Sequence, residues 1–399
     1  MTRFITATAT AALMAGSAMA AGHGDEVKLG IILGYTGPIE SMVAHMGPAA
    51  ELAITEVSES GLLLDGMKVT AVTGDTTCID SGAAAAATER LITADGVKGI
   101  IGGDCSGVTG AMLQNVAVPN GIVMVSPSAT SPGLSHENNE DEGLFFRTSP
   151  SDARQGVVMT EILMDLDINE VAVTYTNNDY GKGLADAFQA AFEEAGGTIT
   201  INAAHEDGKG DYSSEVASLA SAGGDRLVVA GYVDQGGSGI VRSALDSGAF
   251  DTFHFPDGMI SDTLTANFGD EIDGSSGQHP SPSEELASRF TEVAGGAFEA
   301  TSPFAPESYD AAALIMLAMQ KAGSVEPGDY KDHIMDVANA PGEEIYPGEL
   351  AKALQILADG GEVDYVGASG VELIGSGESA GNYRQVELGG GELNTVGFR

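Results

Sequence analysis

Residues 99–107 read GIIGGDCSG and contain the pattern that decides the fold. The short apolar run at 99–102 predicts a buried strand, and Ser106 is placed to begin a helix that extends to about residue 118. A strand that passes through a short turn directly into a helix is the repeating unit of parallel sheets covered on both faces.

The same unit recurs on both sides of this stretch. In the N-terminal part the predicted strands are 27–33, 68–73, 99–102 and 122–125, and the predicted helices are 44–59, 81–93 and 106–118. In the following part the predicted strands are 170–175, 198–204, 226–230 and 252–255, and the predicted helices are 152–167, 180–195, 212–222 and 235–247. Each run therefore predicts one doubly wound α/β lobe.

The chain changes character after about residue 274, where prolines become frequent. A helix at 309–321 is apolar nearly all round and is predicted to be buried. A glycine-rich stretch, 375–391, contains a predicted strand at 384–388. We read this part as completing the two lobes, because 399 residues suit two domains and no third core is evident. The expected division is 25–146 plus about 276–378 for lobe 1 and 147–275 plus about 379–399 for lobe 2, joined by a hinge.

The N-terminus has the features of a secretory signal. Arg3 is followed by an apolar stretch at 4–14 and by small residues at 18–20 that suit cleavage. The stretch is shorter than the ~20 residues that span a membrane. We expect residues 1–21 to be a cleaved signal peptide and the protein to be exported; an ordinary N-terminal helix is the alternative.

The charge balance is strongly acidic, with 17 basic against 58 acidic residues and a net charge of −41. Such a surface repels nucleic acid and anionic lipid, so neither is expected as a partner. The charges are dispersed along the chain, which is typical of a solvated surface.

The chain contains two cysteines, Cys78 and Cys105. An even number in an exported protein favours a disulfide, which would stabilise by roughly 3 to 4 kcal/mol in the chain-entropy model. Two inert buried thiols are the alternative, while a metal pair is disfavoured because no third ligand lies nearby.

Motifs for catalysis are absent. The phosphate-binding, nucleophile-elbow and dinucleotide-binding glycine patterns do not occur, and the seven histidines are isolated. We therefore predict a protein that is not an enzyme and has no cofactor and no metal site.

Small hydroxyl residues follow two predicted strands of the first lobe, at 102–106 and 126–130. Ligands of open parallel sheets lie beyond the carboxyl ends of the strands. Ser106 could offer its hydroxyl and nearby backbone N–H groups to an anion there. The alternative is that Ser106 only caps its helix and that 126–130 only turns the chain.

These segments give the chain a resemblance to the periplasmic solute-binding proteins for branched-chain amino acids, which have the type I binding-protein fold. The likeness rests on KLG at 28–30, TGPI at 36–39, DTTC at 75–78, IGGDCS at 101–106, SPSAT at 126–130, DYGKG at 179–183, GY at 231–232 and PDG at 256–258. Their order and spacing cover nearly the whole chain after the signal.

The resemblance implies roles for individual residues. Ser106 and Thr130 match positions that hold a ligand carboxylate, and Ser128, next to Ala129, matches one whose carbonyl accepts from the ligand ammonium. Asp257 stands where the family usually has Glu as the counter-charge to that ammonium.

Tyr180 and Tyr232 match contacts from the second lobe that close over the ligand. Cys78 and Cys105 match the family's disulfide.

The expected side-chain pocket departs from the family pattern. Met42 stands where an aromatic residue is usual, and Asp104 where an apolar residue is usual. His45, Cys105 and Glu307 are further candidates for this pocket. If Asp104 lines this pocket, we expect a ligand with a polar or cationic side chain rather than a purely aliphatic one. The alternative is that Asp104 points away, into solvent or a backbone network.

The resemblance thus predicts a monomeric periplasmic substrate-binding protein of an ABC importer. It would capture an amino-acid-type small molecule between two lobes and deliver it to a permease in the inner membrane. A ligand-sensing receptor of the same fold, a receptor for another small metabolite and an exported α/β enzyme are the alternatives.

Overall fold

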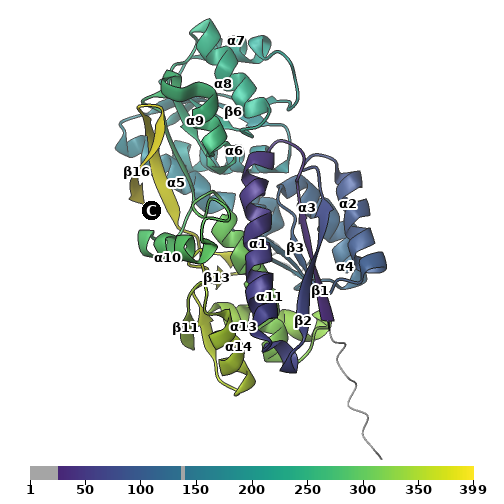
Figure 1. Ribbon diagram of the computed structural model, residues 1–399. Coiled ribbons are helices and arrows are strands. Elements are labelled where there is room, and N and C mark those ends of the chain that lie inside the picture. Colours follow the sequence, from purple (N-terminus) through teal and green to yellow (C-terminus); the bar gives the residue numbers. More distant parts are fainter. Residues whose placement is uncertain (1–25, 136–139) are drawn as a thin grey trace, which may run out of the picture.

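The computed structural model describes residues 26–135 and 140–399 and shows two α/β lobes, stacked one above the other in Figure 1. Each lobe is built on a seven-stranded sheet. The predicted two-lobe, doubly wound fold is therefore confirmed, whereas the predicted signal peptide lies outside the described residues.

The first sheet has the strand order β13-β14-β5-β4-β3-β1-β2. Its strands are β1 (Glu26–Leu33), β2 (Lys68–Asp75), β3 (Ile100–Gly102), β4 (Met124–Ser126), β5 (Phe145–Pro150), β13 (Leu373–Ile374) and β14 (Glu378–Ser379). All neighbours pair in parallel except β13 with β14. A small two-stranded sheet of β11 (Glu343–Ile345) and β12 (Val363–Tyr365) is separate from it.

The second sheet has the order β16-β15-β10-β9-β8-β6-β7. Its strands are β6 (Glu170–Thr176), β7 (Thr198–His205), β8 (Arg226–Ala230), β9 (Phe253–Phe255), β10 (Ser276–Pro280), β15 (Tyr383–Gly389) and β16 (Glu392–Phe398). The hairpin of β15 and β16 adds antiparallel to β10, and the other neighbours are parallel.

Both sheets repeat one strand order, in which the first strand lies between the second and the third. This order, β2-β1-β3 in one sheet and β7-β6-β8 in the other, reverses the direction of winding beside the first strand. A crevice opens at the carboxyl ends of the strands at such a point, and ligands of open α/β sheets bind there. The topology thus gives each lobe one such position.

Helices cover both faces of the sheets (Figure 1). In the first lobe they are α1 (Glu40–Ser60), α2 (Ser81–Arg90), α3 (Ser106–Met112), α4 (Val118–Asn120), α10 (Glu284–Ala294), α11 (Ala305–Ala322), α12 (Pro327–Tyr330), α13 (Ile334–Ala338) and α14 (Leu350–Ala358). In the second lobe they are α5 (Asp152–Asp165), α6 (Asp179–Glu194), α7 (Ser213–Ala222), α8 (Gly236–Ser247) and α9 (Asp262–Phe268).

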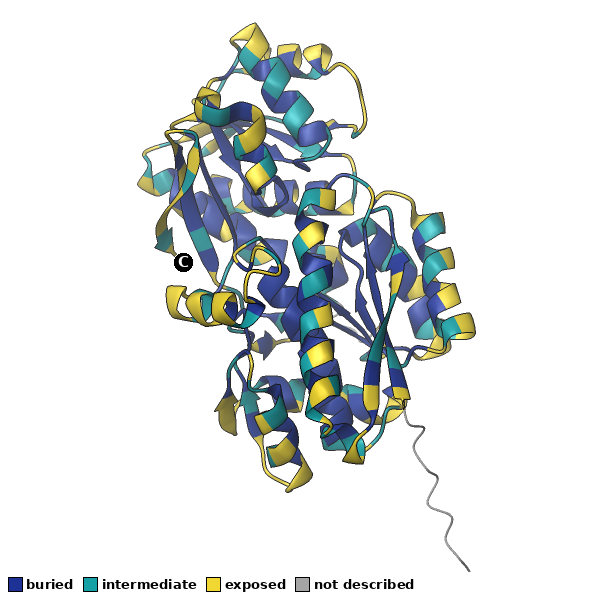
Figure 2. Ribbon diagram, in the orientation of Figure 1, coloured by how far each residue is buried: buried dark blue, intermediate teal, exposed yellow. Residues whose placement is uncertain are grey.

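Helix α11 is the most deeply buried helix segment of the first lobe. Every residue from Ala305 to Gln320 is buried, because α11 packs against α1, α13, α14 and the sheet. In Figure 2 the central strands, such as β3, β4 and β8, are likewise buried, while the edge strands β2, β7 and β16 and the outer face of α1 carry exposed residues. The predicted buried helix at 309–321 is confirmed.

The chain passes between the sheets after β5, after β10 and after β14. These crossings differ from the expected division of the chain. Residues 147–150 belong to β5 of the first sheet, and 276–280 form β10 of the second sheet. Both segments extend a sheet by one strand before the chain changes lobe, so hydropathy alone places the crossings a few residues too early.

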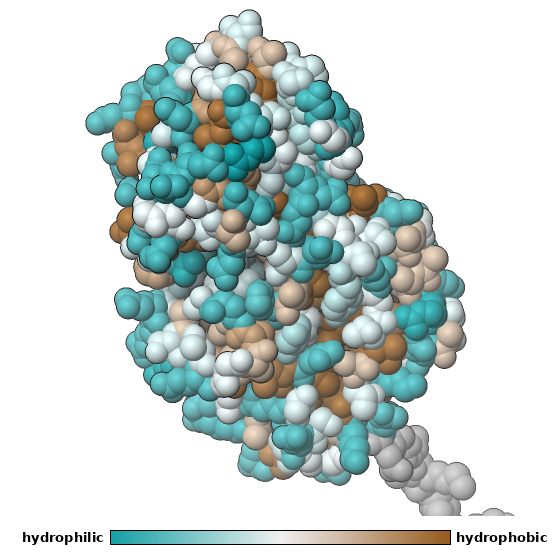
Figure 3. Space-filling model, turned by 45° about the horizontal axis from the view of Figure 1, so that its top comes forward, coloured by the Kyte–Doolittle hydropathy of each residue, from teal (hydrophilic) through white to brown (hydrophobic). Residues whose placement is uncertain are grey.

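The surface is predominantly hydrophilic on the face drawn in Figure 3, as the acidic composition leads one to expect. Among the described residues, no helix combines the length and the apolar character needed to cross a membrane.

Candidate functional site

A small cavity lies between the lobes, where the carboxyl ends of the two sheets face each other. With the lobes as they stand in this structure, its free volume is about 20 Å³. The first lobe contributes Ile39, Met42, Asp104, Cys105, Ser106, Ser128 and Phe304, and the second lobe contributes Tyr180, Tyr232, Asp257 and Gly258. Most of these residues directly follow β3, β4, β8 or β9, so the strand order itself brings them together.

Two loops of the first lobe present hydroxyl groups to the cavity. Ser106 and Ser128 both line it. The Ser126 hydroxyl ties the loops together, because it donates to the Gly103 carbonyl at 2.6 Å and accepts from the Ala129 N–H at 3.0 Å. The Ser106 hydroxyl accepts from the Ser131 N–H at 3.1 Å.

Arg147, on β5, holds the second of these loops from behind. Its fully buried guanidinium donates to the carbonyls of Ala129 and Ser131 at 3.1 and 2.9 Å. The same group pairs with Glu378 of β14 at 2.6 Å. The loop is therefore anchored to a strand that lies next to a crossing between the lobes.

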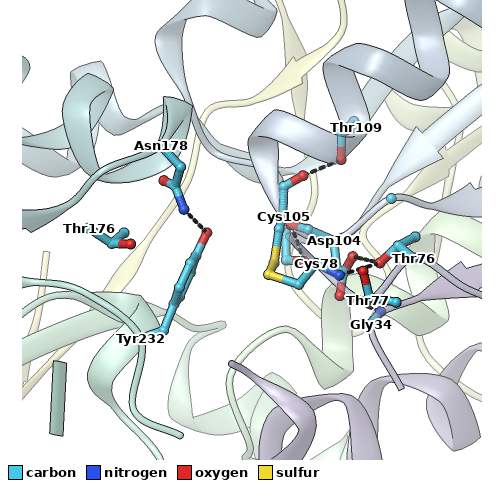
Figure 4. Close-up of a disulfide and its surroundings, with 12 residues drawn as sticks. Gly34, Thr76, Thr77, Cys78, Asp104, Cys105, Thr109, Thr176, Asn178 and Tyr232 are labelled. Carbon is cyan, nitrogen blue, oxygen red and sulfur yellow. Dashed lines mark hydrogen bonds between the residues drawn. A yellow bond between two sulfur atoms is a disulfide. The ribbon is translucent and has the colours of Figure 1, made fainter. Parts of the chain in front are cut away.

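The second lobe presents two stacked tyrosines and a carboxylate. The rings of Tyr180 and Tyr232 lie 5.2 Å apart with nearly parallel planes. Tyr180 donates its hydroxyl to Asp257 Oδ1 at 2.6 Å, and the Gly258 N–H donates to the same oxygen at 2.8 Å. Figure 4 looks across the cleft, with Tyr232 and Asn178 on one side and the disulfide on the other.

Asp257 keeps its second oxygen free of such bonds. Within the described part of the chain, Oδ2 is buried and has no hydrogen-bond partner. Burial raises the pKa of this carboxyl, and the bonds from Tyr180 and Gly258, together with the Gln155 side chain, partly oppose that rise. A buried acceptor without a partner is costly, so this oxygen is suited to a cationic group of a ligand.

Asp104 lines the cavity but is engaged within its own lobe. Its Oδ2 accepts from the Gly34 N–H at 2.5 Å, and its Oδ1 accepts from the Thr76 hydroxyl at 2.9 Å (Figure 4). Burial raises the pKa of the carboxyl, and these two bonds oppose that rise.

Cys78 and Cys105 form a disulfide with a Cα–Cα distance of 5.2 Å. The predicted disulfide is confirmed, and the alternative of two free thiols is wrong. The bridge joins the loops that follow β2 and β3, and Cys105 lies in the cavity wall.

Four of the predicted residues are not among those that line the cavity. Ala129 and Thr130 are buried in the loop beneath it, and Glu307 is buried on α11. His45 lines a separate, wider cavity of about 500 Å³ between the lobes, where its Nδ1 accepts from the Glu299 N–H at 3.2 Å.

Three lining residues were not predicted. Gly258 follows Asp257 directly, so the motif at 256–258 could have indicated it. Ile39 ends the motif at 36–39, which could likewise have indicated it, whereas Phe304 lies outside any motif or strand and nothing in the local sequence distinguishes it from a core residue.

The lobes also touch outside the cavity. Asp234, in the loop after β8, accepts from the Ser41 N–H at 2.9 Å through Oδ2. The Asp234 N–H in turn donates to the Pro38 carbonyl at 3.2 Å. We call these two bonds the Asp234 clasp.

Among the residues with described positions, no group of three or more His, Cys, Asp or Glu side chains is arranged to hold a metal ion. The polar atoms of the cavity are instead hydroxyls and one free carboxylate oxygen.

Comparison with known proteins agrees with this geometry. A family model described as periplasmic binding protein matches residues 26–338. The Leu/Ile/Val-binding protein homolog 1 of Brucella melitensis biotype 1 is 30% identical over 308 residues, which are 76% of this chain and 80% of the relative.

Solved structures show the same fold. A leucine-binding protein from Thermotoga maritima has a TM-score of 0.78 at 22% identity, covering 93% of this chain and 98% of that protein. A solute-binding protein of an ABC transporter from R. palustris, in complex with benzoate, has a TM-score of 0.74 at 19% identity, covering 94% and 96%.

Proposed function

The chain belongs to the periplasmic binding protein family, and from that premise we propose that it captures an α-amino acid between its lobes for an ABC importer. The observation that carries the proposal is the composition of the cavity wall. It combines the hydroxyl residues Ser106 and Ser128 of the first lobe with the Asp257 carboxyl of the second.

An α-amino acid fits such a cavity because its two charged groups need different partners. Ser106 and the loop ending in Thr130 would receive the carboxylate, and Asp257 with the Ser128 carbonyl would receive the ammonium group. Tyr180 and Tyr232 would close over the ligand from the second lobe. Since the partners come from both lobes, the ligand itself would hold the cleft shut.

The remaining wall favours an aliphatic side chain. Ile39, Met42 and Phe304 are apolar and offer contacts to an aliphatic group. Because Asp104 already binds two donors of its own lobe, it offers little to a polar ligand group. The Leu/Ile/Val-binding relatives support a branched aliphatic amino acid as the ligand.

The remaining proposals concern the setting of the protein. We expect export by the signal at 1–21, a monomer in the periplasm and delivery of unchanged ligand to an inner-membrane permease. A sensor of the same fold would contact a receptor instead. Cross-linking of the loaded protein in native membranes distinguishes them, since capture of a receptor without any permease would contradict the transport proposal.

Isothermal titration of unfolded and refolded, ligand-free protein tests the ligand class. Leucine, isoleucine and valine are compared with 4-methylpentanoate, which lacks the ammonium group of leucine, with isopentylamine, which lacks its carboxylate, and with benzoate. We expect at least one amino acid to bind and the three other compounds to bind about a hundredfold more weakly or not at all. Equal binding of leucine and 4-methylpentanoate, or preferential binding of benzoate, would overturn the proposal.

The Asp257→Asn variant tests the proposed ammonium site. Loss of a desolvated charged partner typically costs ~2 to 5 kcal/mol, so affinity for the amino acid should fall about a hundredfold or more. Asp262→Asn, at an exposed position of the same lobe, is the matched control and should bind normally. Near-native affinity of a folded Asp257→Asn protein would remove this assignment.

A further inference from the structure

A second carboxylate lies behind the cavity. Asp152, in the first turn of α5, is fully buried. Its Oδ1 accepts from the Gln155 side-chain amide at 2.7 Å, whereas its Oδ2 is buried without a partner among the described residues. Helix capping explains neither the burial nor the free oxygen, because Ser151 supplies the cap.

One amide side chain connects Asp152 to Asp257. Gln155 donates to Asp152 through Nε2 and accepts from the Asp257 N–H through Oε1 at 3.2 Å. That oxygen also accepts from Gln278 at 3.1 Å, which fixes the orientation of the amide. The two carboxyl groups are thus held in one polar cluster, and each has one unpartnered oxygen.

Thr130 joins the same cluster from the first lobe. Its carbonyl accepts from the Asp152 N–H at 2.8 Å. Its hydroxyl is buried and faces the Asp152 carboxyl, whose pKa it lowers, but neither it nor the two carboxylate oxygens completes a hydrogen bond in the part of the chain that is described. Three neighbouring residues from both lobes therefore contribute an unsatisfied oxygen, although buried polar atoms are nearly always hydrogen-bonded.

The charges around the cluster leave it acidic. Arg147 faces Asp152 but is already paired with Glu378 at 2.6 Å. Tyr180, Tyr232 and Tyr383 also face the pair, and burial raises the pKa of each phenol well above its ordinary value, so they stay neutral.

Arg154, on the same helix as Asp152, faces Tyr383 from a half-buried position. Burial raises the pKa of both carboxyl groups, and the charge of Asp257 adds to the rise at Asp152. Two carboxylates that share a buried site do not both ionise readily.

We propose that Asp152 and Asp257 hold one proton between them and that the ammonium group of the ligand takes its place on binding. The proton leaves to the solvent, the ligand keeps its ammonium group, and both carboxylates are ionised in the complex. The nature of the arriving cation rests on the proposed function; the shared proton does not.

This arrangement makes a cationic group a condition for binding. A carboxylic acid without an ammonium group, such as benzoate, brings no positive charge to replace the proton of the pair, and it adds a further negative charge. Asp152 thus acts as a positioning residue that works through Asp257 and sets the class of ligand. Affinity for an amino acid should rise with pH, by up to tenfold per pH unit, while the pair still holds its proton.

Infrared difference spectroscopy of the ligand-free protein tests the shared proton directly. Difference spectra against the wild-type protein should show the loss of one carboxylic-acid C=O band in both Asp152→Asn and Asp257→Asn. The band of Glu307, whose pKa burial raises well above its ordinary value, is common to the three proteins and cancels. Asn at 152 keeps the oxygen that accepts from Gln155, and circular dichroism confirms folding. A difference spectrum that lacks this loss for either variant would overturn the proposal whatever the protein binds.

Titration with L-leucine in two buffers of different protonation enthalpy tests the exchange. We expect the wild-type protein to release close to one proton for each leucine that it binds. Asp152→Asn should release none and should bind leucine about tenfold more weakly. Glu56→Gln, at a half-buried carboxyl of α1 away from the cleft whose pKa burial also raises, is the control and should match the wild type.

Leucine that binds without proton release would contradict the proposal. Failure of every tested amino acid to bind would instead contradict the proposed function, with the infrared result still deciding whether the proton is shared.

Discussion

Asp104 has both carboxylate oxygens occupied by donors of its own lobe, the Gly34 N–H and the Thr76 hydroxyl. Asp104→Leu would leave these two donors buried without a partner, at a cost of about 1 to 3 kcal/mol each. We therefore expect this variant to lose about 2 to 6 kcal/mol of unfolding free energy while the ranking of amino acids stays the same. Urea denaturation measures the first effect and the titration panel the second.

Met42→Leu is the comparison for that experiment, because Met42 lines the same cavity through apolar atoms alone. A volume-conserving exchange of this kind usually costs less than about 1.5 kcal/mol. We expect it to change the ranking of the ligands without a large loss of stability. A change in ranking with Asp104→Leu would instead support the expectation, drawn from sequence, that Asp104 sets side-chain selectivity.

Sequence reasoning located the polar cavity residues because they follow strands directly. Ser106 and Asp257 are such residues, and the strand order places their loops face to face. Glu307 could not be placed, since α11 is buried all round and its hydrophobic pattern does not distinguish one face. The Asp152 cluster depends on contacts between segments more than 20 residues apart, as from Asp152 to Thr130, and no local pattern encodes them.

The disulfide acts at the level of elements, because it joins the loops after β2 and β3 over a separation of 27 residues. The chain-entropy model assigns such a loop roughly 3.5 kcal/mol. We expect the Cys78→Ser, Cys105→Ser double variant to lose that much unfolding free energy in urea denaturation. Ligand affinity should also fall, since Cys105 is part of the cavity wall.

The wild-type protein incubated with reductant provides the control for this prediction. Thiol labelling shows whether the reductant has opened the bridge. Where it has, the protein should lose as much stability as the double variant. An unchanged denaturation midpoint in the labelled protein would mean that the bridge contributes no net stability.

Prediction of the elements succeeded where a strand is an apolar run between turns, as in β1, β6 and β8. It failed for β5, whose sequence FFRTSP carries the Arg147 anchor and loses apolar character after two residues. The short strands β13 and β14 and the exposed strand β16 also escaped prediction, because two-residue pairs and solvated edges have no distinctive periodicity. Pairing with neighbours distant in sequence, rather than local propensity, defines these strands.

At the scale of the whole molecule, the second lobe carries three buried histidines. Burial lowers the pKa of His205 to about 4 and those of His254 and His279 to about 3. The unfolded chain therefore binds more protons than the folded one below pH ~6.5. The stability that these residues contribute is complete above that pH and is lost as the pH falls towards 4 and 3.

We expect each histidine to remove about 2 kcal/mol of unfolding free energy between pH 7.5 and pH 5. His254→Gln should reduce the total loss by that amount, as measured by urea denaturation at the two pH values. His333→Gln, at a partly exposed position of the first lobe, serves as the control and should behave like the wild type. Equal pH dependence of His254→Gln and the wild type would show that His254 is not kept neutral in the folded protein.

The Asp234 clasp joins the lobes through groups that do not line the cavity. Its two bonds help to hold the cleft shut to the same extent for every ligand, so they bear on how long a molecule stays rather than on which molecule is chosen. Removing a charged hydrogen bond of ~1.5 kcal/mol should speed ligand release about tenfold. Stopped-flow measurements on Asp234→Ala, with Glu40→Ala as the exposed control, should show shorter dwell times with unchanged ratios between amino acids. A carrier that gives up its cargo at a permease must balance retention during diffusion against the speed of handover, and the clasp offers a means of adjusting that timing without altering the binding site.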